Sequence, residues 1–155
     1  MQIKKVTLVY FSATDTTRRT LHAIAEGIGA ETAEVDFTLP AARETVPSFG
    51  PEDFVIFGAP VYGGLLPLFV REYLEGVKGQ NTPCAVIGVY GNRDFDDFLV
   101  EMEDLVTENG FIVMSGAAFI GEHSFSREIA PGRPDAEDLA IARRFGAEIK
   151  EKPFA

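Results

Sequence analysis

Three long apolar runs, each ending abruptly in a polar or glycine-containing turn, constrain the fold of this chain more than any other feature. They fall within Ile3–Phe11, Asp53–Ala59 and Thr82–Tyr90. A strand that is covered by helices on both faces lacks the alternation of polar and apolar residues that marks a half-exposed strand. The three runs therefore predict central strands of a parallel sheet.

Two weaker strand patterns and four helical patterns complete the chain. Ala33, Val35 and Phe37 alternate with polar residues and predict an edge strand, and Phe111–Ile120 predicts a fifth strand with a bulge or bend at Gly116. Apolar residues recur three and four positions apart in four amphipathic stretches. The expected buried faces are Leu21, Ile24, Ala25 and Ile28; Leu66, Phe69, Val70, Tyr73, Leu74 and Val77; Phe98, Leu99, Met102, Leu105 and Val106; and Leu139, Ala142, Phe145 and Ile149.

This alternation predicts an α/β fold in a single domain spanning residues 1–155. We expect a three-layer α/β/α sandwich around a five-stranded parallel sheet of order 2-1-3-4-5, with right-handed crossovers. We also expect Thr16 or Thr17 to cap the first helix, Asp135 to cap the last, and 40–51 to be a loop. In sheets of this order, ligands bind beyond the carboxyl ends of strands 1, 3 and 4. Those ends read SATDTT, PVYGG and YGNRDF.

Composition excludes several classes of function. The chain has 24 acidic and 14 basic side chains, a formal net charge of -10, which argues against a nucleic-acid surface. Cys84 is the one cysteine, so the chain holds no internal disulfide and no cysteine-ligated zinc or iron–sulfur cluster, and we expect it in the core. No apolar run approaches the ~20 residues of a membrane span. We expect a cytoplasmic protein without a signal peptide.

The turn after the first strand has the chemistry of a phosphate site. Val9–Thr17 passes from a strand through hydroxyl residues into a helix, where free backbone N–H groups and the helix dipole favour an anion. It contains no glycine, which excludes a dinucleotide fingerprint and a P-loop. The turn therefore suits a terminal phosphomonoester. The carboxylate of Asp15 would repel a phosphate unless it points outward, and aspartate tolerates a positive φ, which such a turn can need, better than most residues do.

SATDTT, GAPVYGG and VYGNRDFDD together resemble the flavodoxins, the small FMN-binding electron carriers, over essentially the whole chain. The last two motifs are most similar to flavodoxin-like domains that stand alone or are fused to ferredoxin modules in anaerobic microbes. The resemblance implies a phosphate loop and two loops that hold the isoalloxazine ring. Asp15 departs from it, since the family usually has glycine there. The implied FMN-binding residues are Ser12, Ala13, Thr14, Asp15, Thr16, Thr17, Pro60, Val61, Tyr62, Gly63, Gly64, Tyr90, Gly91, Asn92, Arg93 and Phe95.

Tyr62 and Phe95 are the two expected ring neighbours, because each follows the end of a central strand and a flat side chain can stack on a tricyclic ring. Ordinary packing remains the alternative for both, and Tyr90 is an alternative ring neighbour or a core residue. The resemblance implies that the Gly63 carbonyl, freed by the Gly63–Gly64 pair, accepts a hydrogen bond from flavin N5 after one-electron reduction. Backbone N–H groups of residues 91–93 would face the flavin N1/O2 edge, with Arg93 pointing inward or outward.

Three functions compete. We favour a monomeric carrier of low-potential electrons between transient redox partner proteins of ferredoxin or reductase type, for which the acidic 94–104 segment is a solvated face or a docking surface. The alternative is an FMN-dependent oxidoreductase acting with NAD(P)H on a quinone or porphyrinogen. Substrate contacts would then come from the loop that carries His123, Ser124, Ser126, Arg127 and Arg133. A signalling receiver domain is discounted, because Gly58-Ala59-Pro60 replaces its acceptor aspartate and Gly121-Glu122 its lysine.

Overall fold

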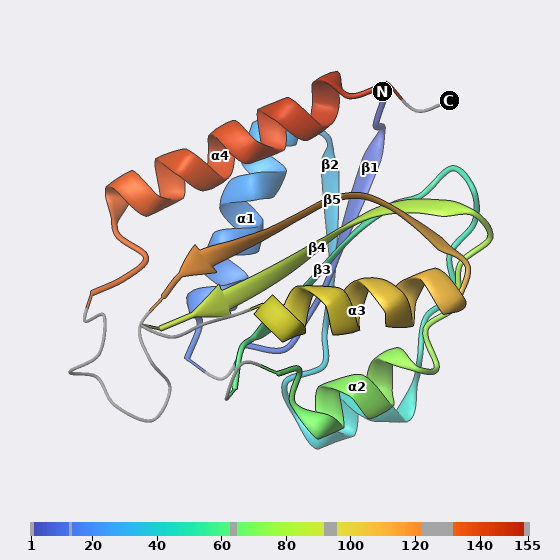
Figure 1. Cartoon of the computed structure of the whole chain (residues 1–155). Coiled ribbons are helices and arrows are strands. Elements are labelled where there is room, and N and C mark those ends of the chain that lie inside the picture. The colour runs from blue at the N-terminus through green and yellow to red at the C-terminus, as the bar shows by residue number, and fades with distance from the viewer. Residues whose placement is uncertain (1, 13, 63–64, 92–95, 122–131, 154–155) are drawn as a thin grey trace.

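Five parallel strands form the middle layer of the computed structural model, in the order β2-β1-β3-β4-β5 (Figure 1). The structure describes residues 2–12, 14–62, 65–91, 96–121 and 132–153. The strands are β1 (Lys5–Tyr10), β2 (Glu31–Asp36), β3 (Phe54–Pro60), β4 (Thr82–Tyr90) and β5 (Phe111–Ile120). The predicted strand order is confirmed, and β2 is the predicted half-exposed edge.

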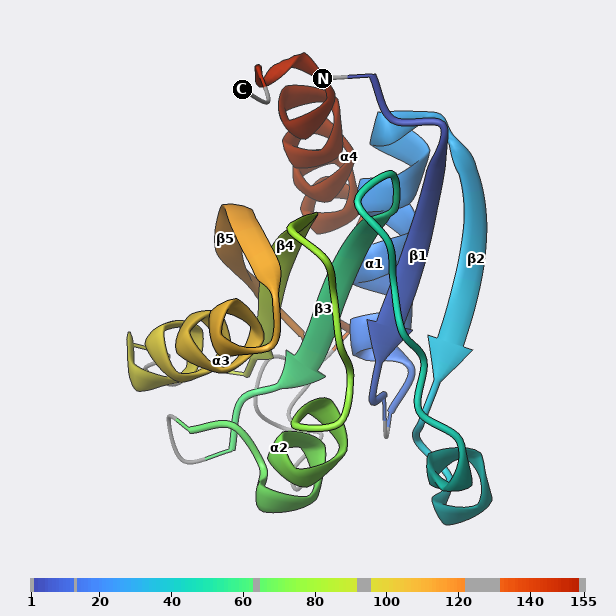
Figure 2. The same cartoon turned by 90° about the vertical axis from the view of Figure 1, so that its right-hand side faces the viewer.

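Helices cover both faces of the sheet (Figures 1 and 2). On one face lie α1 (Thr16–Ile28) and α4 (Ala136–Glu151), and on the other lie α2 (Leu68–Leu74) and α3 (Asp96–Glu108). This gives the predicted three-layer α/β/α sandwich. Each layer boundary has its own apolar core, and the two cores are separated by the strands of the sheet.

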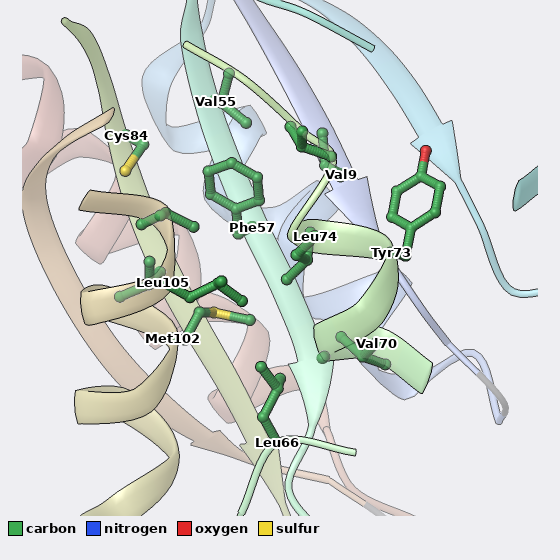
Figure 3. Packing of buried hydrophobic residues seen from close by; sticks show 14 of the residues in the cluster. Val9, Val55, Phe57, Leu66, Val70, Tyr73, Leu74, Cys84, Met102 and Leu105 are labelled. Carbon is green, nitrogen blue, oxygen red and sulfur yellow. The ribbon is translucent and has the colours of Figure 1, made fainter. Parts of the chain in front are cut away.

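The core beneath α2 and α3 contains the predicted helix faces (Figure 3). Val70 and Leu74 of α2 and Met102 and Leu105 of α3 point toward the strands, and Phe57 lies between the two helices. Cys84 is fully buried in this core, as predicted, and burial raises the pKa of its thiol. The cysteine is therefore a packing residue at neutral pH.

Three local features differ from the sequence prediction. The helix α2 begins after Pro67 and ends at Leu74, so Val77 is buried without being helical. A 3₁₀ turn, η1 (Pro40–Glu44), lies within the predicted loop. The strand β5 is irregular at Met114 rather than at Gly116, since the pairing register with β4 shifts between Cys84 and Ala85.

Candidate functional site

The carboxyl ends of β1, β3, β4 and β5 meet at one edge of the sheet (Figure 1). Past the last paired residues, the Phe11 N–H donates to the Gly58 carbonyl at 3.2 Å and the Val61 N–H donates to the Val89 carbonyl at 3.0 Å. The Gly121 N–H continues the edge by donating to the Tyr90 carbonyl at 2.7 Å. The segments that follow the central strands therefore start side by side.

The first of these segments turns into α1 at Asp15, which has a left-handed backbone with φ 67° and ψ -2°. Its side chain forms no capping hydrogen bond. The Ser12 hydroxyl instead accepts the Arg18 N–H at 3.1 Å. The prediction that Thr16 or Thr17 caps α1 is therefore wrong, because the turn places both inside the helix and reaches back to Ser12 for an acceptor.

The same turn leaves donors for an external anion. Within the described part of the chain, the structure assigns no acceptor to the backbone N–H groups of Thr16 and Thr17, the first two residues of α1. The Thr14 and Thr16 hydroxyl oxygens lie 3.2 Å apart, and Thr14 is half-buried whereas Thr16 and Thr17 are buried. A helix start with free N–H groups and adjacent hydroxyls is suited to phosphate.

The segment after the edge strand β2 anchors this turn through Thr38, a residue that the sequence did not point to. The Thr38 hydroxyl oxygen accepts the Ser12 N–H at 2.9 Å. Thr38 is itself held by Asp36, whose Oδ1 accepts both the Thr38 N–H and the Thr38 hydroxyl. The Asp-x-Thr spacing signals a local turn in the sequence. It does not reveal that this turn supports Ser12.

A second polar group ties β1, β2 and α1 together below the turn. The buried Tyr10 hydroxyl donates to Glu34 Oε1 at 2.8 Å, and His22 Nε2 lies 2.6 Å from the same oxygen. Burial and the hydrogen bond to Glu34 raise the pKa of Tyr10. Burial alone would raise the pKa of Glu34, but hydrogen bonds from His22 and Tyr10 and the nearby Arg18 outweigh it, so this pKa is lowered. Glu34 is therefore a stable anion at neutral pH.

The second segment begins beyond β3, where Tyr62 pairs with Leu65. The Tyr62 N–H donates to the Leu65 carbonyl at 3.1 Å, and the Leu65 N–H donates to the Tyr62 carbonyl at 3.0 Å. Tyr62 and Tyr90 are both half-buried. Val61 packs against the core next to Phe98 and its N–H donates to the Val89 carbonyl, so its carbonyl is the polar group that remains for a ligand.

The third segment follows β4, where Gly91 is buried. The end of β5 closes the same edge against α1, because a Cβ on Gly121 would lie 3.2 Å from Thr16 Cβ and 2.7 Å from Val89 Cγ1. Gly121 thus brings the last strand into contact with the start of α1. The close approach leaves no room there for a side chain.

Several predicted site residues lie outside the described residues: Ala13, Gly63, Gly64, Asn92, Arg93, Phe95, His123, Ser124, Ser126 and Arg127. The described members are Ser12, Thr14, Asp15, Thr16, Thr17, Pro60, Val61, Tyr62, Tyr90 and Gly91, and the strand ends bring them to one edge. Arg133 has a different place. It hydrogen-bonds to Asp138, with Nη2 and Oδ1 2.5 Å apart, so it is held at the start of α4.

Neither a metal-binding cluster nor a membrane-spanning helix is present among the described residues. No group of three or more His, Cys, Asp or Glu side chains there is arranged to hold a metal ion. None of the helices in that part of the chain has the length and apolar character needed to cross a bilayer. The start of α1, by contrast, offers N–H and hydroxyl donors that suit a phosphate.

The chain is similar to flavodoxins and to other flavoproteins. No family model matches the chain. Flavodoxin FldP of Pseudomonas aeruginosa (strain UCBPP-PA14) is 27% identical over 160 residues, which cover 95% of this chain and 79% of that protein. Diflavin flavoprotein A 2 of Thermosynechococcus vestitus is 25% identical over 97% of this chain. The chain spans only 26% of that protein's length. The solved structure of a flavodoxin from the domain Archaea superposes with a TM-score of 0.63 at 20% identity, covering 95% of this chain and 96% of that one.

Proposed function

Since the chain is flavodoxin-like in both sequence and fold, we propose that it binds FMN non-covalently and carries electrons between redox partner proteins. When bound, FMN supplies one- and two-electron redox chemistry. The protein's part is to hold the phosphate, position the ring and control the charge around it.

The observation that best supports this proposal is the set of hydrogen-bond donors at the start of α1. Free N–H groups at Thr16 and Thr17 and the hydroxyls of Ser12 and Thr14 lie where a central strand ends. This set offers neutral donors, so it can bind a phosphate without any lysine. In a chain of net charge -10, such donors offset part of the repulsion on an anion.

The ring would lie against the segments after β3 and β4. Half-buried Tyr62 and Tyr90 supply flat side chains at that edge, and Pro60, Val61 and Gly91 supply backbone groups. We also assign Ala13, Gly63, Gly64, Asn92, Arg93 and Phe95 to the site on the strength of their motifs. Exclusion of water by these residues would strengthen each polar contact to the cofactor.

We favour a monomeric carrier in the cytoplasm, with transient ferredoxin- or reductase-type partners, over an enzyme with its own substrate. Arg133, one of the residues considered for substrate contact, is engaged by Asp138. The formal net charge of -10 favours partner proteins with basic docking patches. A carrier needs an exposed cofactor edge and no dedicated substrate cavity.

Reduction of the purified, FMN-loaded protein tests this function. Anaerobic titration with dithionite, followed by absorption spectroscopy, should proceed in two one-electron steps, whereas addition of NADH or NADPH alone should leave the flavin oxidised. Rapid bleaching by NAD(P)H would contradict the carrier and support the oxidoreductase. Colourless protein that takes up no added FMN would contradict both.

A further inference from the structure

Asp15 places a negative charge at the start of α1, next to the proposed phosphate position. Its left-handed backbone is one that glycine adopts most easily, and its side chain is 56% exposed and makes no cap. A carboxylate beside the free N–H groups of a helix would compete with, and repel, an incoming phosphate dianion. The chain therefore needs a means of neutralising this charge.

Arg18 lies at the position that can supply it. Its Nη1 is 3.4 Å from Asp15 Oδ1, and this pairing is the main cause of the raised pKa of Arg18. Asp15 directly precedes α1 and Arg18 lies in its first turn, so the pair spans the helix start. The backbone N–H of Arg18 also donates to the Ser12 hydroxyl.

A second carboxylate, that of Glu34, lies near the Arg18 guanidinium. Arg18 Nε lies 3.8 Å from Glu34 Oε1, and Glu34 is held in turn by Tyr10 and His22. Arg18 is thus drawn between β2 and the turn by two anions on different elements. The two ion pairs favour a position of the half-exposed guanidinium beside Asp15.

We propose that Arg18 is a positioning residue for the phosphate of FMN, acting by neutralising Asp15 rather than by contacting the phosphate. This inference rests on the proposed function. It assigns to Arg18 the task of keeping the Asp15 carboxylate from repelling the phosphate, so that loss of Arg18 alone weakens binding of FMN and not of riboflavin, which lacks the phosphate. The two residues form one unit, so the effect of changing Arg18 depends on the charge at position 15.

A double-mutant cycle tests the proposal through equilibrium binding of FMN and of riboflavin to the apoprotein, measured by flavin fluorescence. Arg18→Gln should weaken FMN binding about tenfold. Asp15→Asn, which keeps a residue that tolerates the left-handed backbone, should bind FMN at least as tightly as the parent. In the Asp15→Asn background, Arg18→Gln should change FMN binding by less than about threefold. Riboflavin binding should stay within about twofold throughout.

Matched controls separate this role from a general loss of charge or structure. Arg143→Gln removes a guanidinium of the same 45% exposure, paired with Glu26 at 3.6 Å on the α1–α4 pair, and should leave FMN binding unchanged. Arg18→Lys should restore most of the affinity lost in Arg18→Gln, and the loss should shrink in high salt. Urea unfolding of each apoprotein verifies that the variants are folded.

Two results would overturn the inference while leaving the proposed function intact. One is an equal loss of FMN affinity from Arg18→Gln with and without Asp15→Asn, which would place Arg18 directly on the phosphate. The other is an equal loss for riboflavin, which would make Arg18 merely structural. A parent protein that binds no FMN would overturn the proposed function itself, and the inference with it.

Discussion

Ser12 stabilises the turn before α1 with two different groups. Its hydroxyl accepts the Arg18 N–H, and its own N–H donates to Thr38. One residue therefore links the end of β1, the first turn of α1 and the segment after β2. A change at Ser12 should affect both the stability of the helix start and the binding of an anion there.

We expect Ser12→Ala to lower the free energy of unfolding of the apoprotein by about 1 kcal/mol, the usual cost of losing a capping acceptor. FMN affinity should fall roughly tenfold, since a hydrogen bond to a charged group contributes about 1.5 kcal/mol. Urea unfolding and fluorescence titration measure the two effects. Thr32→Ala, which removes an exposed hydroxyl bonded to the Ala30 carbonyl, should change neither. Unaltered stability in Ser12→Ala would contradict the capping role.

For single residues, the sequence predicts the properties of each residue better than it predicts which residues contact one another. A positive φ at Asp15 was considered because the flavodoxins, which the sequence resembles, usually have glycine there, and Asp15 does have a φ of 67°. The Thr38–Ser12 and Tyr10–Glu34 contacts could not be predicted, because each joins residues more than twenty positions apart. Only the strand pairing of β1 with β2 brings them together.

The two helices α1 and α4 cross at a pair of glycines. A Cβ on Gly27 would lie 1.9 Å from the Arg143 carbonyl oxygen, and a Cβ on Gly146 would lie 2.0 Å from the Ile24 carbonyl oxygen. Each glycine therefore receives the backbone of the opposite helix. Their cost in helix propensity is offset by this close contact.

Gly146→Ala should destabilise the protein by about 1–3 kcal/mol, although alanine is the better helix former, because backbone atoms must move apart. Chemical denaturation of the apoprotein measures the change. Gly50→Ala is the control, since its Cβ would make only an ordinary contact at 3.8 Å with Asp53. A Gly146→Ala variant as stable as the parent would show that α1 and α4 can separate without cost.

The start of α4 carries a pH-dependent interaction. Asp135 caps the helix as predicted, and Asp138 completes a capping box with it. Hydrogen bonds from Arg133 outweigh the effect of burial and lower the pKa of Asp138 below its ordinary 3.8. A carboxylate with a lowered pKa in the folded state stabilises the fold above its ordinary pKa, and this stabilisation is lost as the pH falls through the lowered value.

Asp138→Asn should therefore reduce stability at neutral pH by about 1 kcal/mol, the scale of a lost capping interaction. The difference from the parent should shrink as the pH falls below about 3.8. Urea unfolding across this pH range measures it. Glu148→Gln, on the exposed face of the same helix, should give a small difference at every pH. A constant difference for Asp138→Asn would contradict the ionic origin of the effect.

Element boundaries were predictable where the pattern was long and regular. The observed β4 and β5 have the predicted limits, since each is bounded by clear turn residues. The α2 helix was predicted too long, because Val77 continues the apolar spacing after the helix has ended at Leu74. The spacing of apolar residues indicates which side chains are buried. A buried residue that follows a helix, such as Val77, can continue the three- and four-residue spacing of the helix.

At the scale of the whole molecule, the topology brings the strand ends and the start of α1 to one edge. The order 2-1-3-4-5 followed from the half-exposed pattern of one strand and the continuous apolar runs of three others. Both described ends of the chain lie at the opposite end of the sheet (Figure 1). The sequence thus predicted which strand ends meet. It did not predict the contacts from the segment after β2 that hold the turn before α1 in place.

The central claim is that the phosphate of FMN binds at the start of α1 while the ring lies by the ends of β3 and β4. Amide chemical shifts of ¹⁵N-labelled apoprotein, titrated in parallel with FMN and with riboflavin, test it most directly. FMN should shift the N–H signals of Thr14–Thr17 together with those of Tyr62 and Gly91, whereas riboflavin should shift only the latter two. Shifts from FMN that leave Thr14–Thr17 unmoved, or that match those from riboflavin, would contradict the account.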